Sequence, residues 1–219
     1  MAYPIYFTDG SAFSSPLGKV VCVGRNYAEH AKELNNPIPT EPILFIKPES
    51  SVVRLSNDLR IPSSDCHYEA EIAILVGAHL CNANDKDVLN AIEGVGLGLD
   101  LTKRALQSRL KEKSHPWELA KSFDGACPLS DFVSSAEFSD LSNLEFSLEI
   151  NGELKQLGNS CEMLTPIVSL IVYMSKHFSL RPGDVVLTGT PKGVGELFSG
   201  DKLVLKLMNK MTVTSQVVA

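Results

Sequence analysis

The sequence predicts an α+β fold that is rich in β-strand. Segments with the alternating or continuously apolar pattern of strands outnumber helical segments along the 219 residues. Most of these segments are joined by short turns, which is typical of antiparallel hairpins, whereas a doubly wound fold would alternate each strand with a helix. No linker is long enough to divide the chain, so we expect a single domain over residues 1–219, with residues 1–18 as a short N-terminal appendage.

Short strands dominate the predicted N-terminal half. Each is an apolar or β-branched run that ends at a glycine, a proline or a polar turn. The predicted strands are residues 20–23, 43–46, 52–54, 59–61 and 68–76. One short helix is expected at residues 27–34, because the prolines at 37, 39 and 42 make the following segment a loop.

The middle of the chain predicts two helices with a strand between them. Asn84 or Asp85 is placed to cap a helix that runs to residue 93, where Gly94 would end it. Residues 95–101 alternate as a strand, and residues 102–113 follow as a polar helix.

The C-terminal third contains the clearest hairpin signal. Asn151 and Gly152 separate strands expected at 145–150 and 153–156, and a type I′ turn needs residues that tolerate positive φ at both central positions. A helix is expected at 166–177, with Pro166 in its first turn. A turn at 181–184 leads to a strand at 185–188, and residues 202–208 and 211–218 predict a closing hairpin.

The composition excludes several classes of partner. The chain has 20 Lys and Arg against 26 Asp and Glu, a net charge of −6, which disfavours binding to nucleic acid or to anionic membranes. Its five cysteines contain no C-x-x-C pair, so we expect neither a zinc knuckle nor a disulfide framework, and a reducing compartment. The N-terminus resembles no targeting signal, and the longest apolar stretch is too short to span a bilayer. We therefore expect a cytoplasmic protein.

Two glutamates on one predicted strand are the first candidate site residues. Alternation within residues 67–76 places Glu69 and Glu71 on the same face, with their Cα atoms about 6.5–7 Å apart. Two adjacent like charges destabilise a strand unless water or a cation compensates them. On their own, a solvent-facing pair is the commoner explanation.

A third acid favours a metal site. In residues 95–101 the alternation places Asp100 on the same face as Gly96 and Gly98. Glycine weakens a strand interior, and close approach of a ligand or of another backbone is the usual compensation. Three carboxylates form an oxygen-only set that suits Mg²⁺ or Mn²⁺ better than zinc, and they leave room for a bidentate substrate.

The glycine-rich segments match no nucleotide-binding motif. Residues 94–98 lack the G-x-G-x-x-G spacing of a dinucleotide-binding loop, and residues 189–195 lack the spacing of a phosphate-binding P-loop. The glycines of residues 189–195 suit a tight loop whose backbone N–H groups bind an anion, and they suit plain turn chemistry equally well.

Four motifs stand out as a set. They are Glu-x-Glu at 69–71, Gly-x-Gly-x-Asp at 96–100, Ala-Lys-Ser-Phe-Asp at 120–124 and Leu-Thr-Gly-Thr-Pro-Lys-Gly-Val-Gly at 187–195. Together they closely resemble the fumarylacetoacetate hydrolase family, in particular its small single-domain group of acylpyruvate hydrolases and oxaloacetate decarboxylases or tautomerases. The resemblance covers nearly the whole chain. It implies a mixed β-roll with short peripheral helices, one catalytic domain and a homodimer.

The resemblance also assigns roles to single residues. Glu69, Glu71 and Asp100 match the ligands of a divalent metal, usually Mg²⁺, with Mn²⁺ and Ca²⁺ as alternatives. His30 and Glu33 match a His-x-x-Glu dyad that activates water when its helix closes over the substrate; three residues apart on a helix, the two side chains can touch. Without the resemblance, a surface His–Glu pair would be the favoured explanation.

Further matches concern the substrate. Lys121 matches an active-site lysine that holds the substrate carboxylate or the developing enolate oxygen. The remaining matches lie near the substrate in the family, and they are Arg25, Asn26, Tyr27, Lys47, Gly189 and Thr190. An ordinary lysine at a strand end is an equally good explanation of Lys47. The sequence departs from the family at Tyr68, where many relatives have a second histidine before the first glutamate.

The implied substrate is a small anionic 2-oxo acid. The first hypothesis is an Mg²⁺-dependent hydrolase that cleaves the C–C bond of acylpyruvates through an enolate. The second is an oxaloacetate keto–enol isomerase or decarboxylase, or an isomerase or decarboxylase of catabolic 2-oxo diacids. All these reactions share one stabilised enolate, so the metal ligands alone do not separate them. A non-catalytic metabolite-binding protein is a third hypothesis, which the complete set of ligands, dyad and lysine disfavours.

Overall fold

Eight strands form the central sheet of the computed structural model, which describes residues 3–62 and 65–218. The strands are β1 (Val20–Gly24), β2 (Ile43–Lys47), β3 (Val52–Arg54), β6 (Ala70–Val76), β7 (Ile92–Leu99), β9 (Cys127–Leu129), β10 (Val133–Ser134) and β13 (Val185–Leu187). They run in the order β2-β1-β13-β6-β7-β9-β3, and β10 pairs with β7. β1 with β13 and β3 with β9 are parallel pairs and the others are antiparallel, so the sheet is mixed.

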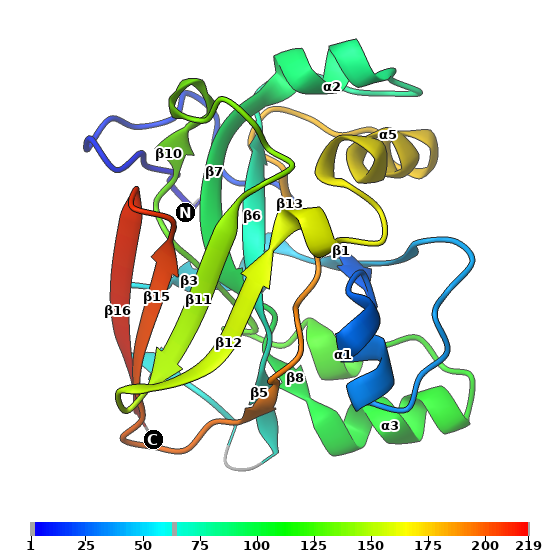
Figure 1. Ribbon diagram of the computed structural model, residues 1–219, viewed down its shortest axis with the longest axis vertical. Helices are drawn as coiled ribbons and strands as arrows, with labels where there is room; N and C mark the ends of the chain where they lie inside the picture. Colours follow the sequence, from blue (N-terminus) through cyan, green and yellow to red (C-terminus); the bar gives the residue numbers. More distant parts are fainter. Residues whose placement is uncertain (1–2, 63–64, 219) are drawn as a thin grey trace.

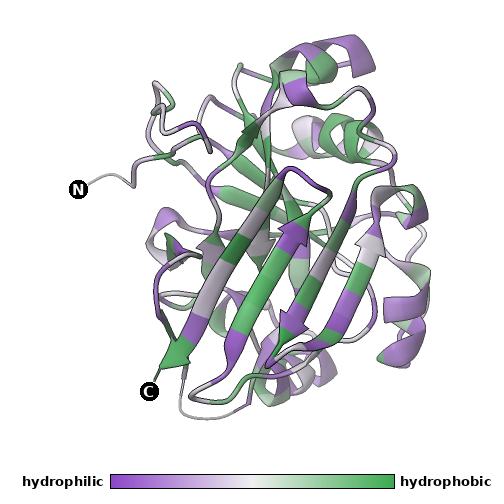
Figure 2. Cartoon of the chain, turned by 60° about the vertical axis from the view of Figure 1, so that its left-hand side comes forward, coloured by the Kyte–Doolittle hydropathy of each residue, from purple (hydrophilic) through white to green (hydrophobic). Residues whose placement is uncertain are grey.

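Two smaller sheets complete the strand framework (Figure 1). The five-stranded sheet has the order β12-β11-β15-β16-β4, from β4 (Leu59–Arg60), β11 (Glu145–Ile150), β12 (Glu153–Asn159), β15 (Lys202–Leu207) and β16 (Met211–Val218). The three-stranded sheet has the order β14-β5-β8, from β5 (Cys66–Tyr68), β8 (Thr102–Lys103) and β14 (Gly195–Glu196). Figure 2 shows hydrophilic and hydrophobic residues mixed along the strands of the five-stranded sheet, as expected where one face packs on the core and the other faces solvent.

The helices are short and lie around the sheets. They are α1 (Ala28–Glu33), α2 (Asp85–Ala91), α3 (Arg104–Glu112), α4 (Glu118–Lys121) and α5 (Ile167–His177), with 3₁₀ turns η1 (Glu49–Ser51), η2 (Ser135–Glu137) and η3 (Ser160–Glu162). Figure 1 shows α2 beside α5 at one end of the molecule and α3 at the other end. Among the described residues, no helix combines the length and apolar character needed to cross a membrane.

Strand β6 is buried on both faces and divides the core in two. Ile72 and Ile74 belong to the larger cluster, which includes residues of α5 and of the five-stranded sheet. Ala73 and Leu75 belong to the smaller cluster on the opposite face. Each fully buried aliphatic side chain contributes about 1.5–3 kcal/mol, so the strand that carries Glu71 is rigidly held.

The N-terminal segment lies against the smaller cluster. Ile5 and Leu17 are buried in it, and Phe7 forms an isolated parallel bridge with Phe132. Residues 1–2 and 219 lie outside the described residues, and the division of the chain into a domain with an N-terminal appendage stays a prediction.

The predicted fold class is confirmed, and so is the central hairpin. Asn151 and Gly152 have φ values of 54° and 81°, as a type I′ turn requires. The second strand of the hairpin continues to Asn159, three residues beyond its predicted end. α5 begins at Ile167, with Pro166 as its capping residue rather than a residue of its first turn.

Several predicted boundaries are wrong, including that of the strand predicted at 95–101, which is β7 at Ile92–Leu99. The predicted strand 68–76 is two strands, because the chain leaves β5 at Tyr68 and enters β6 at Ala70. The predicted helix 102–113 begins only at Arg104, because residues 102–103 pair with β5. The predicted helix to residue 93 ends at Ala91, and Gly94 lies inside β7. A Cβ at Gly94 would lie 2.9 Å from the Cβ of Phe132, so close packing explains this glycine.

Candidate active site

Three buried carboxylates meet where β6 and β7 pair. Glu71 lies on β6 opposite Gly98 of β7, and Asp100 follows the end of β7. Glu69 precedes β6, and its carbonyl accepts a hydrogen bond of 2.8 Å from the backbone N–H of Asp100. One carboxylate oxygen of each residue lies within 4.8 Å of the others. The structure therefore brings the three predicted acids together. Glu69 lies between two strands, β5 and β6, and not on the same strand as Glu71.

Two cations compensate the charge of Glu69. The Nζ atom of Lys121 lies 2.8 Å from Oε2 of Glu69 and 2.5 Å from Oδ2 of Asp100. Arg104 donates from Nη2 to Oε1 of Glu69. Burial alone would raise the pKa of Glu69, but Lys121 and Arg104 together hold it below its ordinary value. Glu69 is therefore a carboxylate at neutral pH.

Glu71 lacks such compensation. Burial raises its pKa well above the ordinary value, and the negative charges of Asp100 and Glu69 raise it further. One hydrogen bond of 2.6 Å from the backbone N–H of Gly189 to Oε2 opposes this effect. The neighbouring cations therefore do not fully compensate the negative charge around Glu71.

Lys47 lies beneath the cluster and is fully buried. Its ammonium donates to the carbonyl oxygens of Leu101 at 3.4 Å, of Ala126 at 3.0 Å and of Lys121. Its Nζ also lies 2.8 Å from Oδ1 of Asp100. An ammonium group has three protons, so this last contact is a charge contact, and Oδ1 of Asp100 is left without a hydrogen bond.

We expect Lys47→Met to destabilise the protein by about 3–5 kcal/mol, because it leaves Asp100 and three carbonyl groups buried without their cation. The urea midpoint of unfolding measures this loss. Lys86→Met, at an exposed lysine of α2, is the control and should leave the midpoint unchanged. An unchanged midpoint for Lys47→Met would show that these contacts contribute little to folding.

The donor set fits a hard divalent cation. Oδ1 of Asp100 is a buried oxygen without a hydrogen-bond donor, and Glu71 has uncompensated charge. Oxygen-only sites of this kind suit Mg²⁺, Mn²⁺ or Ca²⁺, whereas zinc prefers nitrogen and sulfur ligands. Glu69, Glu71 and Asp100 are the residues that would hold such an ion.

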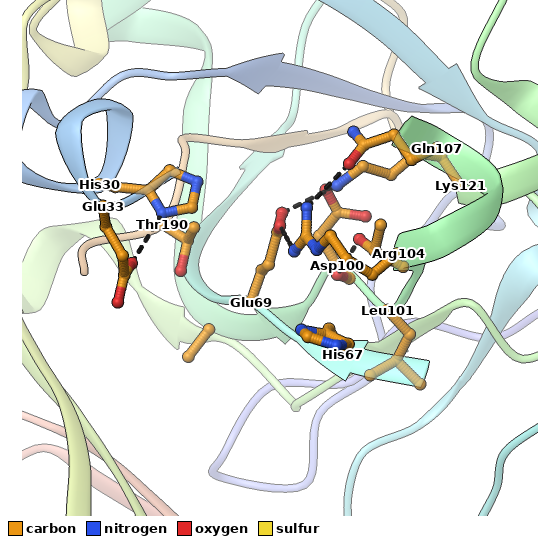
Figure 3. Close-up of polar contacts among 12 residues, drawn as sticks. His30, Glu33, His67, Glu69, Asp100, Leu101, Arg104, Gln107, Lys121 and Thr190 are labelled. Carbon is orange, nitrogen blue, oxygen red and sulfur yellow. Dashed lines mark hydrogen bonds and ion pairs between the residues drawn. The ribbon is translucent and has the colours of Figure 1, made fainter. Parts of the chain in front are cut away.

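The predicted dyad forms on α1. His30 is buried, and its Nδ1 lies 3.4 Å from Oε2 of Glu33, whose carboxylate also accepts from the backbone N–H of Gly193 at 3.0 Å. Burial lowers the pKa of His30, although Glu69 and Glu33 oppose that shift. His30 is therefore a neutral imidazole at pH 7, able to accept a proton. Figure 3 shows His30 and Glu33 on the opposite side of Glu69 from Lys121 and Arg104.

One cavity of about 100 Å³ joins these groups. Predicted site residues that line it are Arg25, His30, Glu69, Glu71, Lys121 and Thr190. The hydroxyl oxygen of Thr190 accepts a hydrogen bond of 2.8 Å from Nε2 of Gln156, so its own proton is left to donate. A single small ligand in this cavity reaches the acids, the imidazole and the lysine together.

Other predicted substrate contacts do not line this cavity. The side chain of Asn26 donates to the carbonyls of Thr165 and Thr188 at 3.0 and 2.9 Å, so it fixes the neighbouring loops. Tyr27 lines a separate groove, and its hydroxyl is buried without a hydrogen-bond partner among the described residues. Gly189 orients Glu71 through its N–H, and its φ of +96° favours glycine.

Sequence reasoning missed several residues that surround the cavity. Arg104, Gln107 and Lys111 line it from one face of α3, at the spacing i, i+3, i+7. This spacing is visible in the sequence of the predicted polar helix, and it indicates that the three side chains share one face. No sequence signal points to Trp117, which also lines the cavity, or to Gln156, which holds Thr190.

Comparison with known proteins identifies the family. The sequence-family model described as fumarylacetoacetate (FAA) hydrolase C-terminal matches residues 19–218 of this chain. The chain belongs to the fumarylacetoacetate hydrolase family. Where this family often has a second histidine, Tyr68 packs with its hydroxyl against Gly195, and the cations Lys121 and Arg104 hold the adjacent Glu69.

Relatives within the family differ in the reactions they are named for. Oxaloacetate tautomerase YcgM of Escherichia coli K12 is 51% identical over 89% of this chain and 90% of its own length. The mitochondrial oxaloacetate decarboxylase of Dictyostelium discoideum is 43% identical over 83% of this chain and 85% of its own length. A crystal structure of fumarylpyruvate hydrolase from Pseudomonas aeruginosa with Mn²⁺ and pyruvate superimposes with a TM-score of 0.92 at 31% identity, covering 99% and 96% of the two chains.

These names favour the second hypothesis from the sequence over the first. The two sequence relatives are named for oxaloacetate chemistry, and the more distant structural relative is named for hydrolysis of an acylpyruvate. The family consists of enzymes that act on small oxo acids. The homodimer and the cytoplasmic location stay predictions.

Proposed function

We propose that this protein is a divalent-metal-dependent oxaloacetate keto–enol tautomerase. The observation that carries the proposal is the single cavity shared by the acid cluster, the neutral His30 and Lys121. The tautomerase relative, 51% identical over 89% of the chain, supports this choice among the reactions of the family.

The residues of the cavity divide the chemistry between them. A divalent cation, when bound by Glu69, Glu71 and Asp100, supplies Lewis-acid stabilisation of negative charge on the 2-oxo oxygen. Lys121 adds a second positive charge near the 2-oxo oxygen. His30 takes a proton from C3 of the keto form or returns one to the enolate, and Glu33 orients its ring.

The size of the cavity supports a small substrate. The cavity has a volume of about 100 Å³, and a four-carbon 2-oxo diacid is smaller than fumarylpyruvate.

Decarboxylation of oxaloacetate is the second candidate. It passes through the same enolate, and one relative is named a decarboxylase. Acylpyruvate hydrolysis is the third candidate, supported by the dyad of His30 and Glu33, which is also suited to activating water.

A comparison of substrates tests the proposal. With Mg²⁺ present, we expect kcat/KM for conversion of enol-oxaloacetate to exceed that for oxaloacetate decarboxylation, and for hydrolysis of acetylpyruvate or fumarylpyruvate, by about a hundredfold or more. Enol absorbance measures the first reaction, and pyruvate release measures the others. A larger kcat/KM for either acylpyruvate would instead support the hydrolase.

A further inference from the structure

Two cations in the cavity have no acidic partner. Arg25, Arg104 and Lys111 all line it, and Arg104 is paired with Glu69. Among residues 3–62 and 65–218, Arg25 forms no hydrogen bond or ion pair, and Lys111 donates one hydrogen bond, of 2.7 Å, to Oδ1 of the neutral Asn36. The charges of Arg25 and Lys111 are therefore available to an anion.

The geometry of α3 places Lys111 away from the acid cluster. Arg104, at the first residue of the helix, contacts Glu69. Lys111 lies seven residues further along the same face, a rise of about 10 Å at 1.5 Å per residue. Its ammonium is held by Asn36 from the loop after α1. Lys111 thus lines the end of the cavity opposite the carboxylates.

Arg25 is held in an unusual backbone conformation. Its φ of 62° lies in the left-handed region, which costs a non-glycine residue about 1 kcal/mol or more. The next residue, Asn26, fixes this conformation through its hydrogen bonds to Thr165 and Thr188. A strained backbone conformation persists where the surrounding contacts hold it in place. Here that conformation accompanies an Arg25 that lines the cavity.

The electrostatics of the cavity favour an anion beside Arg25 and Lys111. Two of the three carboxylates, Glu69 and Asp100, already contact the cations Lys47, Lys121 and Arg104. Partial burial lowers the pKa of Lys111, and the positive charges of Arg25 and Arg104 lower it further. Arg25 and Lys111 therefore repel each other until an anion lies between them.

We propose that Arg25 and Lys111 bind the distal carboxylate of the substrate, and so select four-carbon 2-oxo diacids over 2-oxo acids with an uncharged far end. The inference rests on the proposed function, in which the 2-oxo acid end of the substrate lies at Glu69, Glu71 and Asp100. These two cations favour oxaloacetate over acetylpyruvate, because acetylpyruvate ends in a methyl group and offers them no second carboxylate.

The test compares two ligands that differ only at the far end. 2-Oxobutanoate has the chain of oxaloacetate with a methyl group in place of the distal carboxylate, and it serves as a competitive inhibitor. For Arg25→Met and for Lys111→Met, we expect KM for enol-oxaloacetate to rise about 10- to 100-fold while Ki for 2-oxobutanoate changes less than about twofold. Lys113→Met, at an exposed lysine of the same helix end, should change neither constant.

Two results would overturn the inference. In one, both variants keep the wild-type KM for enol-oxaloacetate. In the other, KM and Ki rise together, which indicates a general loss of site structure. If the wild type does not convert oxaloacetate, the proposed function fails, and calorimetric binding with Mn²⁺ still tests the inference. A preference for oxaloacetate over 2-oxobutanoate that both variants lose supports it, and equal binding of the two ligands by the wild type overturns it.

Discussion

Asp100→Asn is expected to remove divalent-metal binding and to lower kcat/KM for enol-oxaloacetate by about a thousandfold or more. The amide removes one of three charged ligands and its NH₂ group donates rather than accepts. It also faces Lys47 and Lys121, whose charges Asp100 now balances. Mn²⁺ affinity, measured by electron paramagnetic resonance, and turnover are expected to fall together.

A control is needed because Asp100 is also part of a buried ion network. Asp58→Asn, at an exposed aspartate, should keep wild-type Mn²⁺ affinity and turnover. Circular dichroism establishes that the Asp100 variant is folded before its metal affinity is measured. A folded Asp100→Asn protein that binds Mn²⁺ as the wild type does would contradict the assignment of the cluster.

His30→Gln is expected to lower kcat by about 10²- to 10⁴-fold while Mn²⁺ binding is retained. Glutamine keeps a polar side chain of similar reach but cannot take up a proton near neutral pH. Because His30 is not one of the three acids that would hold the metal, this variant should lose proton transfer and keep metal binding. His79→Gln, at an exposed histidine, is the matched control and should be fully active.

The pH dependence of the wild type gives this prediction a second measurement. Enolisation of the keto form requires neutral His30, whose pKa burial holds below the ordinary value. Activity in that direction should therefore be complete at pH 7 and fall as the pH decreases through this lowered pKa. The acidic limb should be missing from the residual activity of His30→Gln. Persistence of the same limb in that variant would assign the titration to another group.

The sequence predicts the fold class and the acid cluster for physical reasons. Alternating polarity identifies a strand with one buried face, and Asn151 with Gly152 specifies a turn through local backbone preference alone. These signals depend on neighbours along the chain. The approach of Asp100 to Glu69 and Glu71 depends on the pairing of β6 with β7, which the strand pattern of either segment does not specify.

Features that arise from distant contacts are not predictable in this way. The chain breaks its strand at Glu69 because residues 66–68 and 70–76 pair in different sheets. Lys47 is fully buried because three carbonyl groups from other segments meet at its ammonium. Asn26 has a polar side chain of the kind that contacts substrates, yet its amide donates to the carbonyls of two loops.

The most direct test of the account is the rate of enol-oxaloacetate consumption by one preparation, measured with Mg²⁺, after removal of the metal by EDTA, and after Mg²⁺ is restored. Spontaneous tautomerisation is subtracted at each step. We expect the enzymatic rate to fall to background with EDTA and to return with Mg²⁺, because the charge of Glu71 is uncompensated and Oδ1 of Asp100 has no hydrogen-bond donor. An enzymatic rate that is undiminished in EDTA would contradict a metal-dependent tautomerase.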